Sequence, residues 1–150
     1  LLQREEDLKE YYSSVLSAFE LDDGHVLHKE DKSFFEKMMQ IIDSHIQDTE
    51  LSVELLSNSL GYSTRQFYRK LKNITDKTPA DIIREYRLTI VERLLLTTQF
   101  SIEEIMDKTG FSNRGTFYKA FAQRFEMTPK QYRKIKAKDV QESSEEGAPE

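Results

Sequence analysis

The chain has 150 residues, of which 37% are hydrophobic, with five glycines, three prolines, no cysteine and a net charge of −5. This composition favours an all-α fold with a modest core, and it excludes disulfide bonds, thiolate nucleophiles and thiolate zinc sites. No apolar run reaches the length of a membrane span and nothing resembles a signal peptide, so we expect a soluble, cytoplasmic protein with no membrane contact.

The charge is distributed unevenly along the chain. Residues 1–50 carry 5 basic and 13 acidic side chains, residues 51–138 carry 17 and 9, and residues 139–150 carry none and 5. Because electrostatic attraction to a polyanion is local, a basic middle between acidic ends favours nucleic acid as a partner of the middle alone. A mixed, solvated surface would give the same counts.

Residues 1–33 are expected to form a linker helix followed by a loop. An apolar stripe runs along the helix from Glu5, and Asp22-Asp23-Gly24 ends the helix. The stripe consists of Leu8, Tyr12, Val15 and Phe19. Since the rest of this helix is charged, the stripe needs a partner surface.

A second helix is expected to begin near Ser33, because apolar residues then recur at spacings of three and four. These core candidates are Phe34, Phe35, Met38, Met39, Ile41, Ile42 and Ile46. At the other end of the chain, residues 139–150 are too polar to offset the entropy lost on ordering. We expect them to form a disordered acidic tail.

An internal repeat lies between these ends. Ser52, Val53, Leu56 and Gly61 correspond to Ser101, Ile102, Ile105 and Gly110 at an offset of 49, and Phe67, Leu71, Thr78 and Pro79 correspond to Phe117, Phe121, Thr128 and Pro129 at an offset of 50. Each copy has the order short helix, glycine-containing turn, longer helix, which is typical of a helix-turn-helix unit. The units are expected at about residues 52–73 and 101–125.

Capping signals support these helix boundaries. Capping boxes are predicted for Ser63 with Gln66, Ser101 with Glu104 and Thr128 with Gln131. Pro79 and Pro129 each follow a Thr, which predicts helix starts at both sites. The apolar residues from Ile82 to Leu95 have helical spacing, so one long connector helix is expected over about residues 79–97.

The longer helix of each unit should bury one face and expose the other. Phe67 and Leu71 point inward in the first unit, as do Phe117, Phe121 and Phe125 in the second. The outward residues are Arg65, Tyr68, Arg69 and Lys72, then Asn113, Arg114, Tyr118 and Lys119. Such basic and aromatic faces suit a major groove, where Arg bonds guanine edges and Lys neutralises phosphates, although ordinary solvated faces have similar compositions.

Residues 34–136 resemble the DNA-binding domain of the AraC/XylS family of transcription regulators. The resemblance rests on LSVELLSNSLGYSTRQFYRKLKNITDKTPADIIREYRL and, after the connector, on FSIEEIMDKTGFSNRGTFYKAFAQRFEMTPKQYRK. It implies an all-α, seven-helix domain over residues 34–138 that binds double-stranded DNA, with base-reading positions at Arg65, Tyr68, Arg69, Arg114, Tyr118 and Lys119. Backbone-contacting or supporting positions are expected at Ser63, Thr64, Gln66, Lys72, Ser112, Asn113, Thr116 and Lys130.

The sequence departs from the family pattern at a few positions. Gly115 stands where many members reach DNA with a side chain. Asp76 and Glu126 stand two residues before the Thr-Pro pairs, where the family usually has Gly, so a left-handed turn would be strained there. Ser57 and Met106 replace the usual Ala in the first helix of each unit.

The resemblance also implies partners beyond DNA. The acidic N-terminal segment looks like the joint to an upstream sensor or receiver domain, as in two-component regulators of this family, and RNA polymerase is a further possible partner. The apolar stripe of the first helix either pairs between protomers as a short coiled coil, giving a homodimer, or completes the last helix of the upstream domain, or lies on a loose surface helix.

Other functional classes have weaker support in the sequence. A helical protein–protein interaction module that does not bind DNA is the alternative function. An enzyme is not expected, because no nucleophile-elbow, phosphate-loop or zinc-protease motif occurs. His25 and His28 beside Asp22 and Asp23 have too short a spacing for a metal site, so we expect no metal and no cofactor.

Overall fold

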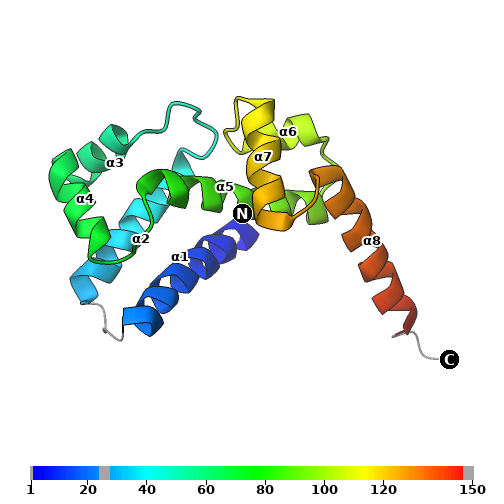
Figure 1. Ribbon diagram of the computed structural model, residues 1–150, viewed down its shortest axis with the longest axis horizontal. Helices are drawn as coiled ribbons and strands as arrows, with labels where there is room; N and C mark the ends of the chain where they lie inside the picture. The colour runs from blue at the N-terminus through cyan, green and yellow to red at the C-terminus, as the bar shows by residue number, and fades with distance from the viewer. Residues whose placement is uncertain (1, 24–27, 147–150) are drawn as a thin grey trace.

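The computed structural model describes residues 2–23 and 28–146, which contain eight helices and no strand. The helices are α1 (Leu2–Asp23), α2 (Lys29–Ser44), α3 (Val53–Leu60), α4 (Thr64–Lys72), α5 (Pro79–Thr97), α6 (Ile102–Lys108), α7 (Arg114–Phe125) and α8 (Pro129–Glu146). The expected all-α fold is confirmed: α2 to α8 form the two helix-turn-helix units with their flanking helices, and α1 precedes them (Figure 1).

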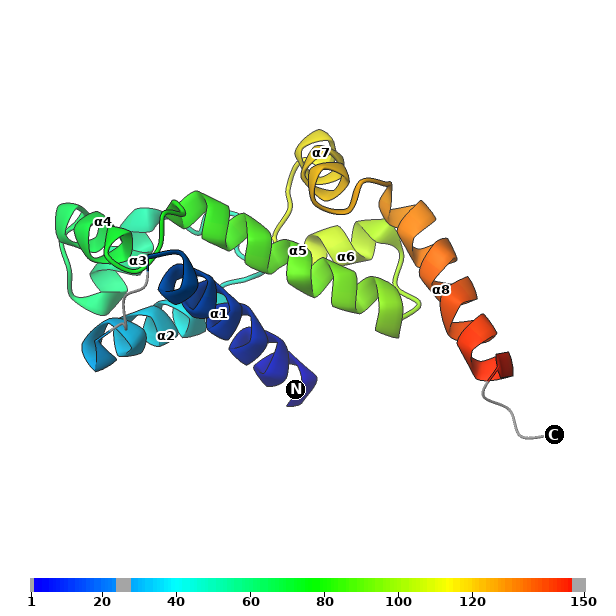
Figure 2. The ribbon, with the colours of Figure 1, turned by 60° about the horizontal axis from the view of Figure 1, so that its bottom comes forward.

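Helix α5 joins two separate hydrophobic cores. Its N-terminal half, with Ile82 and Tyr86, packs with α1 to α4, and its C-terminal half, with Leu88 and Val91, packs with α6 to α8. Figure 2 shows α5 running from one unit into the other. Both units therefore share one rigid helix, and their relative placement follows from it.

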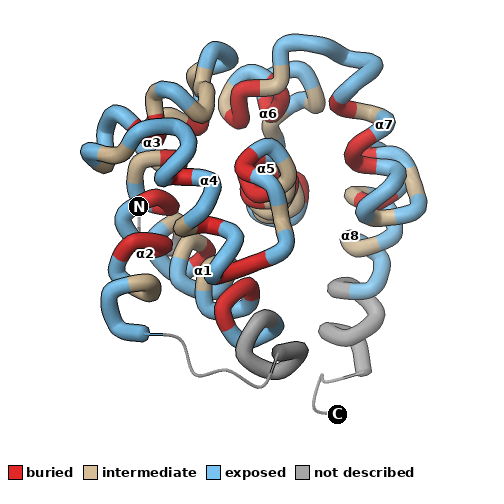
Figure 3. The backbone as a smooth tube through the Cα atoms, turned by 60° about the vertical axis from the view of Figure 1, so that its left-hand side comes forward, coloured by how far each residue is buried: buried red, intermediate tan, exposed pale blue. Residues whose placement is uncertain are grey.

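The inward faces predicted from the spacing are the buried faces. Figure 3 shows the buried positions concentrated where the helices of each unit face one another. In the first core Phe67 is fully buried and Leu71 is 2% exposed, and in the second core Phe117 and Phe121 are fully buried. Ser57 and Met106, the two departures from Ala, are also buried. The hydroxyl of Ser57 donates to the carbonyl of Glu54 at 3.2 Å, so its burial leaves no unsatisfied group.

The apolar stripe of α1 has its partner within the chain. Val15 is buried in the first core, and Leu8 and Tyr12 pack against it, while the side chain of Phe19 lies outside the described residues. Helix α1 contacts α2 and α5. The described part of the stripe is thus packed against the chain's own helices.

Polar contacts fix α1 in place as well. The carboxylate of Asp7, which is 3% exposed, accepts two hydrogen bonds from Arg93 of α5, at 3.0 and 3.2 Å. Arg4 donates to the carboxylate of Asp43 in α2 at 2.8 Å. The hydroxyl of Tyr86 donates to the same carboxylate at 2.6 Å. Charged hydrogen bonds of this kind add specificity to the apolar packing.

Two helix ends differ from the prediction. Helix α2 begins at Lys29 and not near Ser33, because the carbonyl of His28 accepts from the amides of Asp31 and Lys32 and starts the helix earlier. Helix α8 continues to Glu146, so residues 139–146 are helical where a disordered tail was expected. Glutamine, lysine and glutamate are strong helix formers, and this propensity carries α8 past the last core residue.

Most of the predicted caps are present. Ser63 with Gln66 and Thr128 with Gln131 form reciprocal bonds between side chains and backbone amides. The hydroxyl of Ser101 accepts from the amide of Glu104, but the Glu104 carboxylate accepts from that hydroxyl, so the second half of the predicted box is missing. All these caps satisfy amides at the helix N-termini that have no partner within the helix.

Of Asp76 and Glu126, which stand where the family usually has Gly, only Glu126 has a left-handed backbone. Glu126, which caps α7, has φ of 62° and is the one non-glycine residue in the described ranges with positive φ. Asp76 is described and does not share this conformation. In the first unit Asn73, which caps the end of α4, has right-handed helical backbone angles.

The helices found in residues 2–23 and 28–146 include none that is long and apolar enough to span a membrane.

Candidate nucleic-acid interface

Helix α4 presents a basic, solvent-exposed face. Its start is set by the Ser63 cap, and burial of Phe67 and Leu71 turns the opposite side of the helix outward. The exposed residues are Arg65, Tyr68, Arg69 and Lys72. Tyr68 is 47% exposed although it is aromatic, and its ring meets Phe67 edge to face. An exposed tyrosine among cations is a group able to contact bases or phosphates.

The cations of this face are unpaired among the residues that the structure describes. No ion pair holds Arg65, Arg69 or Lys72, whereas Lys70, on the side toward α2, lies 3.6 Å from a carboxylate oxygen of Asp31. The amino group of Lys70 also lies 5.8 Å from the centre of the Phe34 ring. The structure thus separates a structural lysine from three side chains that remain available to a ligand.

Helix α7 repeats this design with one difference. The side chain of Asn113 caps the helix by accepting a hydrogen bond from the amide of Thr116 at 2.9 Å. Burial of Phe117 and Phe121 directs the opposite side of α7 toward solvent. Arg114 and Lys119 are exposed and Tyr118 is half-buried. Arg114, unlike Arg65, has an anionic partner: its Nη1 donates to a carboxylate oxygen of Glu103 in α6 at 2.6 Å. The second face is therefore more constrained than the first.

Six of the predicted supporting residues lie around the N-termini of these helices and are exposed. They are Ser63, Thr64, Gln66, Ser112, Asn113 and Thr116. Ser63, Gln66 and Asn113 use their side-chain oxygens as caps, so in the free protein they define where α4 and α7 begin. Lys130 lies apart from the others, in the first turn of α8. The structure brings the remaining residues to the same ends of the helices as the basic faces.

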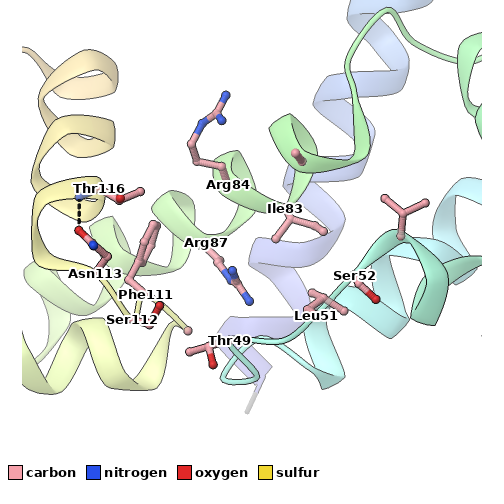
Figure 4. Close-up of a pocket in the computed structure, with 13 residues that line it drawn as sticks. Thr49, Leu51, Ser52, Ile83, Arg84, Arg87, Phe111, Ser112, Asn113 and Thr116 are labelled. Carbon is pink, nitrogen blue, oxygen red and sulfur yellow. Dashed lines mark hydrogen bonds between the residues drawn. The ribbon is translucent and has the colours of Figure 1, made fainter.

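A cavity of about 410 Å³ between the two units contains residues that the sequence patterns did not single out. It is lined by parts of α3, α5 and α7 and by the α6–α7 turn, with Arg84 and Arg87 among the lining residues and Arg87 lying between Leu51 and Phe111 (Figure 4). Nη2 of Arg87 donates to the carbonyl of Asp48 at 2.8 Å. The spacing of apolar residues along α5 predicted which of its positions are buried. Arg84 and Arg87 lie between those positions, so the sequence patterns did not identify them.

Arg87 is constrained by both units. Its Nε is buried with no hydrogen-bond partner, and burial lowers the pKa of the guanidinium from its ordinary value. The α6–α7 turn passes next to it at Gly110, which has φ of 78°. A side chain at that glycine would collide with the guanidinium and with the carbonyl of Ile46. Arg87 therefore occupies a tight junction between the units.

The described residues include no group of three His, Asp or Glu side chains that could hold a metal ion. The sequence offers His25 and His28 beside Asp22 and Asp23 as a weak candidate for a metal site. Of these residues, His25 and the side chains of Asp22 and Asp23 lie outside the part of the chain that the structure describes.

Comparison with known proteins decides the family. The sequence model of a family described as a helix-turn-helix domain matches residues 56–135, more than half of the chain. The regulatory protein SoxS of Escherichia coli K12 is 34% identical over 92 residues, which are 61% of this chain and 85% of SoxS. The chain belongs to the AraC/XylS family of transcription regulators. The resemblance carried by the two sequence motifs is thereby confirmed.

Solved structures agree with the AraC/XylS assignment. The C-terminal domain of the two-component response regulator yesN from Fusobacterium nucleatum is 28% identical with a TM-score of 0.60, over 65% of this chain and 95% of that domain. An AraC-type regulator from Chromobacterium violaceum is 25% identical with a TM-score of 0.64, over 71% of this chain and 94% of that one. The fold described above is therefore the AraC-type fold.

Some AraC/XylS relatives are much longer than this chain. Histidine kinase P4 of Formosa agariphila is 31% identical over 102 residues, which are 68% of this chain and 7% of that protein. The transcriptional regulator AlkR of Acinetobacter baylyi is 34% identical over 82 residues, and these span 27% of its length. The chain thus matches a small part of these two proteins.

Proposed function

We propose that this chain binds a specific double-stranded DNA sequence by placing α4 and α7 in two successive major grooves on one side of the duplex. The observation that carries the proposal is the duplicated face: both helices bury phenylalanine inward and carry arginine, tyrosine and lysine on the other side, with Tyr68 exposed and Tyr118 half-buried. A single such face is ordinary for a soluble helix, but two built on the same plan and joined by one helix match the geometry of a two-groove reader.

The residues of each face have distinct roles in this proposal. Arg65 and Arg69 of α4, and Arg114 of α7, have the donor geometry that recognises the O6 and N7 atoms of guanine. Tyr68, Tyr118 and Lys119 extend the same faces and complete the base-reading set. Lys72 lies at the end of α4, where it neutralises a phosphate without reading sequence. The supporting residues contact the DNA backbone. Lys130 does so from α8, and the others do so from the helix N-termini: Ser63, Thr64, Gln66, Ser112, Asn113 and Thr116.

The connector gives the proposal its geometry. Helix α5 has 19 residues, which corresponds to about 28 Å of helix, and both cores pack on it. Successive major grooves on one side of B-DNA are ~34 Å apart, so a rigid connector of this size fixes the spacing of the two half-sites. The basic charge of residues 51–138 adds attraction for phosphates along the whole site.

In the full-length protein we infer an output role for this domain. Its relatives include a histidine kinase and the C-terminal domain of a two-component response regulator, which supports a sensor or receiver domain upstream of α1. The domain itself then needs neither a catalytic activity nor a cofactor. It works in the bacterial cytoplasm, where its DNA lies, and it acts on transcription together with RNA polymerase.

The test is selection of bound duplexes from a randomised pool at two salt concentrations, followed by anisotropy titration of variants. Arg65→Ala and Arg69→Ala should each cost ~1–3 kcal/mol on the selected site and relax one base pair, whereas Lys72→Ala should weaken all sequences alike. Absence of binding at low salt would overturn the proposal and favour a protein-interaction module. Equal losses on every sequence for all three variants would overturn the roles of the arginines.

A further inference from the structure

The two recognition helices differ at the position where α4 carries Arg65. Their caps are Ser63 and Asn113, so the residue two places after the cap is Arg65 in α4 and Gly115 in α7. Gly115 has no side chain with which to reach a base. The arginine of α7 is instead Arg114, the first residue of the helix, where α4 has Thr64. An arginine at this position leaves the helix at a different angle and must be directed toward the same groove.

Two groups hold the guanidinium of Arg114. Its Nη1 donates to Oε1 of Glu103 at 2.6 Å, and its central carbon lies 5.7 Å from the centre of the Tyr118 ring. The side chains of Arg114 and Glu103 are 63% and 72% exposed. An ion pair this exposed contributes little to stability. It does hold Nη1 of the arginine toward the carboxylate of Glu103 in α6.

The first unit lacks this arrangement although it has the same acid. Glu54 is the second residue of α3 as Glu103 is the second residue of α6, and both are exposed. Opposite Glu54 the first position of α4 is Thr64, which has no charge. Among the described residues no ion pair involves Glu54. The two acids are therefore matched in helix position and exposure, and differ in whether an arginine meets them.

We propose that Glu103 is a positioning residue for base reading by Arg114; this rests on the proposed function. By holding Nη1, the carboxylate leaves Nε and Nη2 to bond O6 and N7 of one guanine. Rotamer freedom of the arginine is lost before binding, so less is lost when the base is contacted. The same carboxylate also repels phosphates, which lowers affinity for all sequences alike.

The experiment compares Glu103→Ala with its matched control Glu54→Ala, using the selected duplex and the set in which each base pair is replaced in turn. Glu54→Ala should raise affinity for every duplex about twofold, because it removes one negative charge near the phosphates, whereas Glu103→Ala should do so only for duplexes in which the pair read by Arg114 is replaced. Only Glu103→Ala should also reduce discrimination, about three- to tenfold, and at one base pair, the pair at which Arg114→Ala acts. In the Arg114→Ala background, loss of Glu103 should not change discrimination further.

The outcomes separate this inference from the function on which it rests. If Arg114→Ala relaxes no base pair, base reading by Arg114 is wrong and the role of Glu103 falls with it. If Arg114→Ala relaxes one pair and Glu103→Ala does not, only the role of Glu103 is overturned. Glu103→Asp keeps the charge but shortens the reach by one methylene, and should lose discrimination without gaining affinity. Equal behaviour of the Glu103 and Glu54 variants would also contradict positioning.

Discussion

Arg87 and Gly110 meet at the junction of the two helix-turn-helix units: a Cβ on Gly110 would lie 2.8 Å from Nη2 of Arg87. The same Cβ would overlap the carbonyl oxygen of Ile46. The backbone of the second unit can approach the connector and the first unit this closely only because residue 110 has no side chain. The contact therefore links the relative placement of α4 and α7 to one glycine and one arginine.

Gly110→Ala should destabilise the protein far more than Gly61→Ala. Both glycines have a left-handed backbone, with φ of 78° and 79°, so each substitution costs about 1 kcal/mol of conformational strain. A Cβ at Gly61 meets no atom within 4 Å, whereas the collision at Gly110 adds about 1–3 kcal/mol. Urea unfolding monitored by circular dichroism measures both. Equal losses for the two variants would show that the close approach does not exist.

Glu126→Gly should increase stability although it removes a side chain. Glu126 has φ of 62°, which costs a residue with a Cβ about 1 kcal/mol, and relief of this strain exceeds the added entropy of the unfolded chain by about 0.5 kcal/mol. Asp76→Gly is the control, because Asp76 occupies the equivalent place without positive φ. It should lower the unfolding free energy by about 0.5–1 kcal/mol. The two melting temperatures should thus move in opposite directions.

Arg93→Ala should weaken the attachment of α1. The substitution removes both hydrogen bonds from Arg93 to Asp7, whose carboxylate is almost fully buried, and should cost about 2–3 kcal/mol. Arg84→Ala removes an exposed pair with Asp81 within the same helix and should cost less than about 1 kcal/mol. The midpoints of urea unfolding measure the loss of stability in both variants. A loss no greater for Arg93 than for Arg84 would mean that α1 is not fixed by this pair.

Stability should fall at alkaline pH partly through Tyr86. Burial, and then the hydrogen bond to Asp43, raise the pKa of its hydroxyl above the ordinary value. The native state therefore keeps this proton when the unfolded state, with a pKa of about 10, has lost it. The contribution of Tyr86 to the free energy of unfolding is therefore fully present below that pH and declines as the pH rises above it. Tyr86→Phe should lower the unfolding free energy at pH 8 yet show a smaller decline by pH 11; an unchanged decline would contradict this.

Local signals were sufficient for most helices. Capping pairs such as Ser63 with Gln66 are three residues apart, so their bonds depend on the immediate sequence only. Periodicity identified the buried faces of α4 and α7 for the same reason. The late end of α8 was missed because low hydrophobicity suggested disorder, while the helix depends on backbone propensity past the last core contact.

Contacts between distant residues were outside the reach of these patterns. The stripe of α1 indicated that a partner was needed but not which one, since Asp7 and Arg93 are 86 positions apart. The exposed arginines of the interface followed from spacing, but the bond from Arg114 to Glu103 crosses a turn whose geometry only the fold determines. Arg87 gave no signal, because the connector carries other charged residues such as Arg84 and Arg93, and nothing in their spacing marks one of them as partly buried.

The claim that both recognition helices read DNA at once, at a spacing set by α5, is tested most directly by separating the half-sites. Affinity should be measured by anisotropy for the selected duplex and for duplexes with two or five base pairs inserted between its halves. A rigid connector predicts that five inserted base pairs, about half a helical turn, reduce affinity as much as replacing one whole half-site. Affinity that is unchanged by the insertion would show that only one helix reads DNA or that the units move independently.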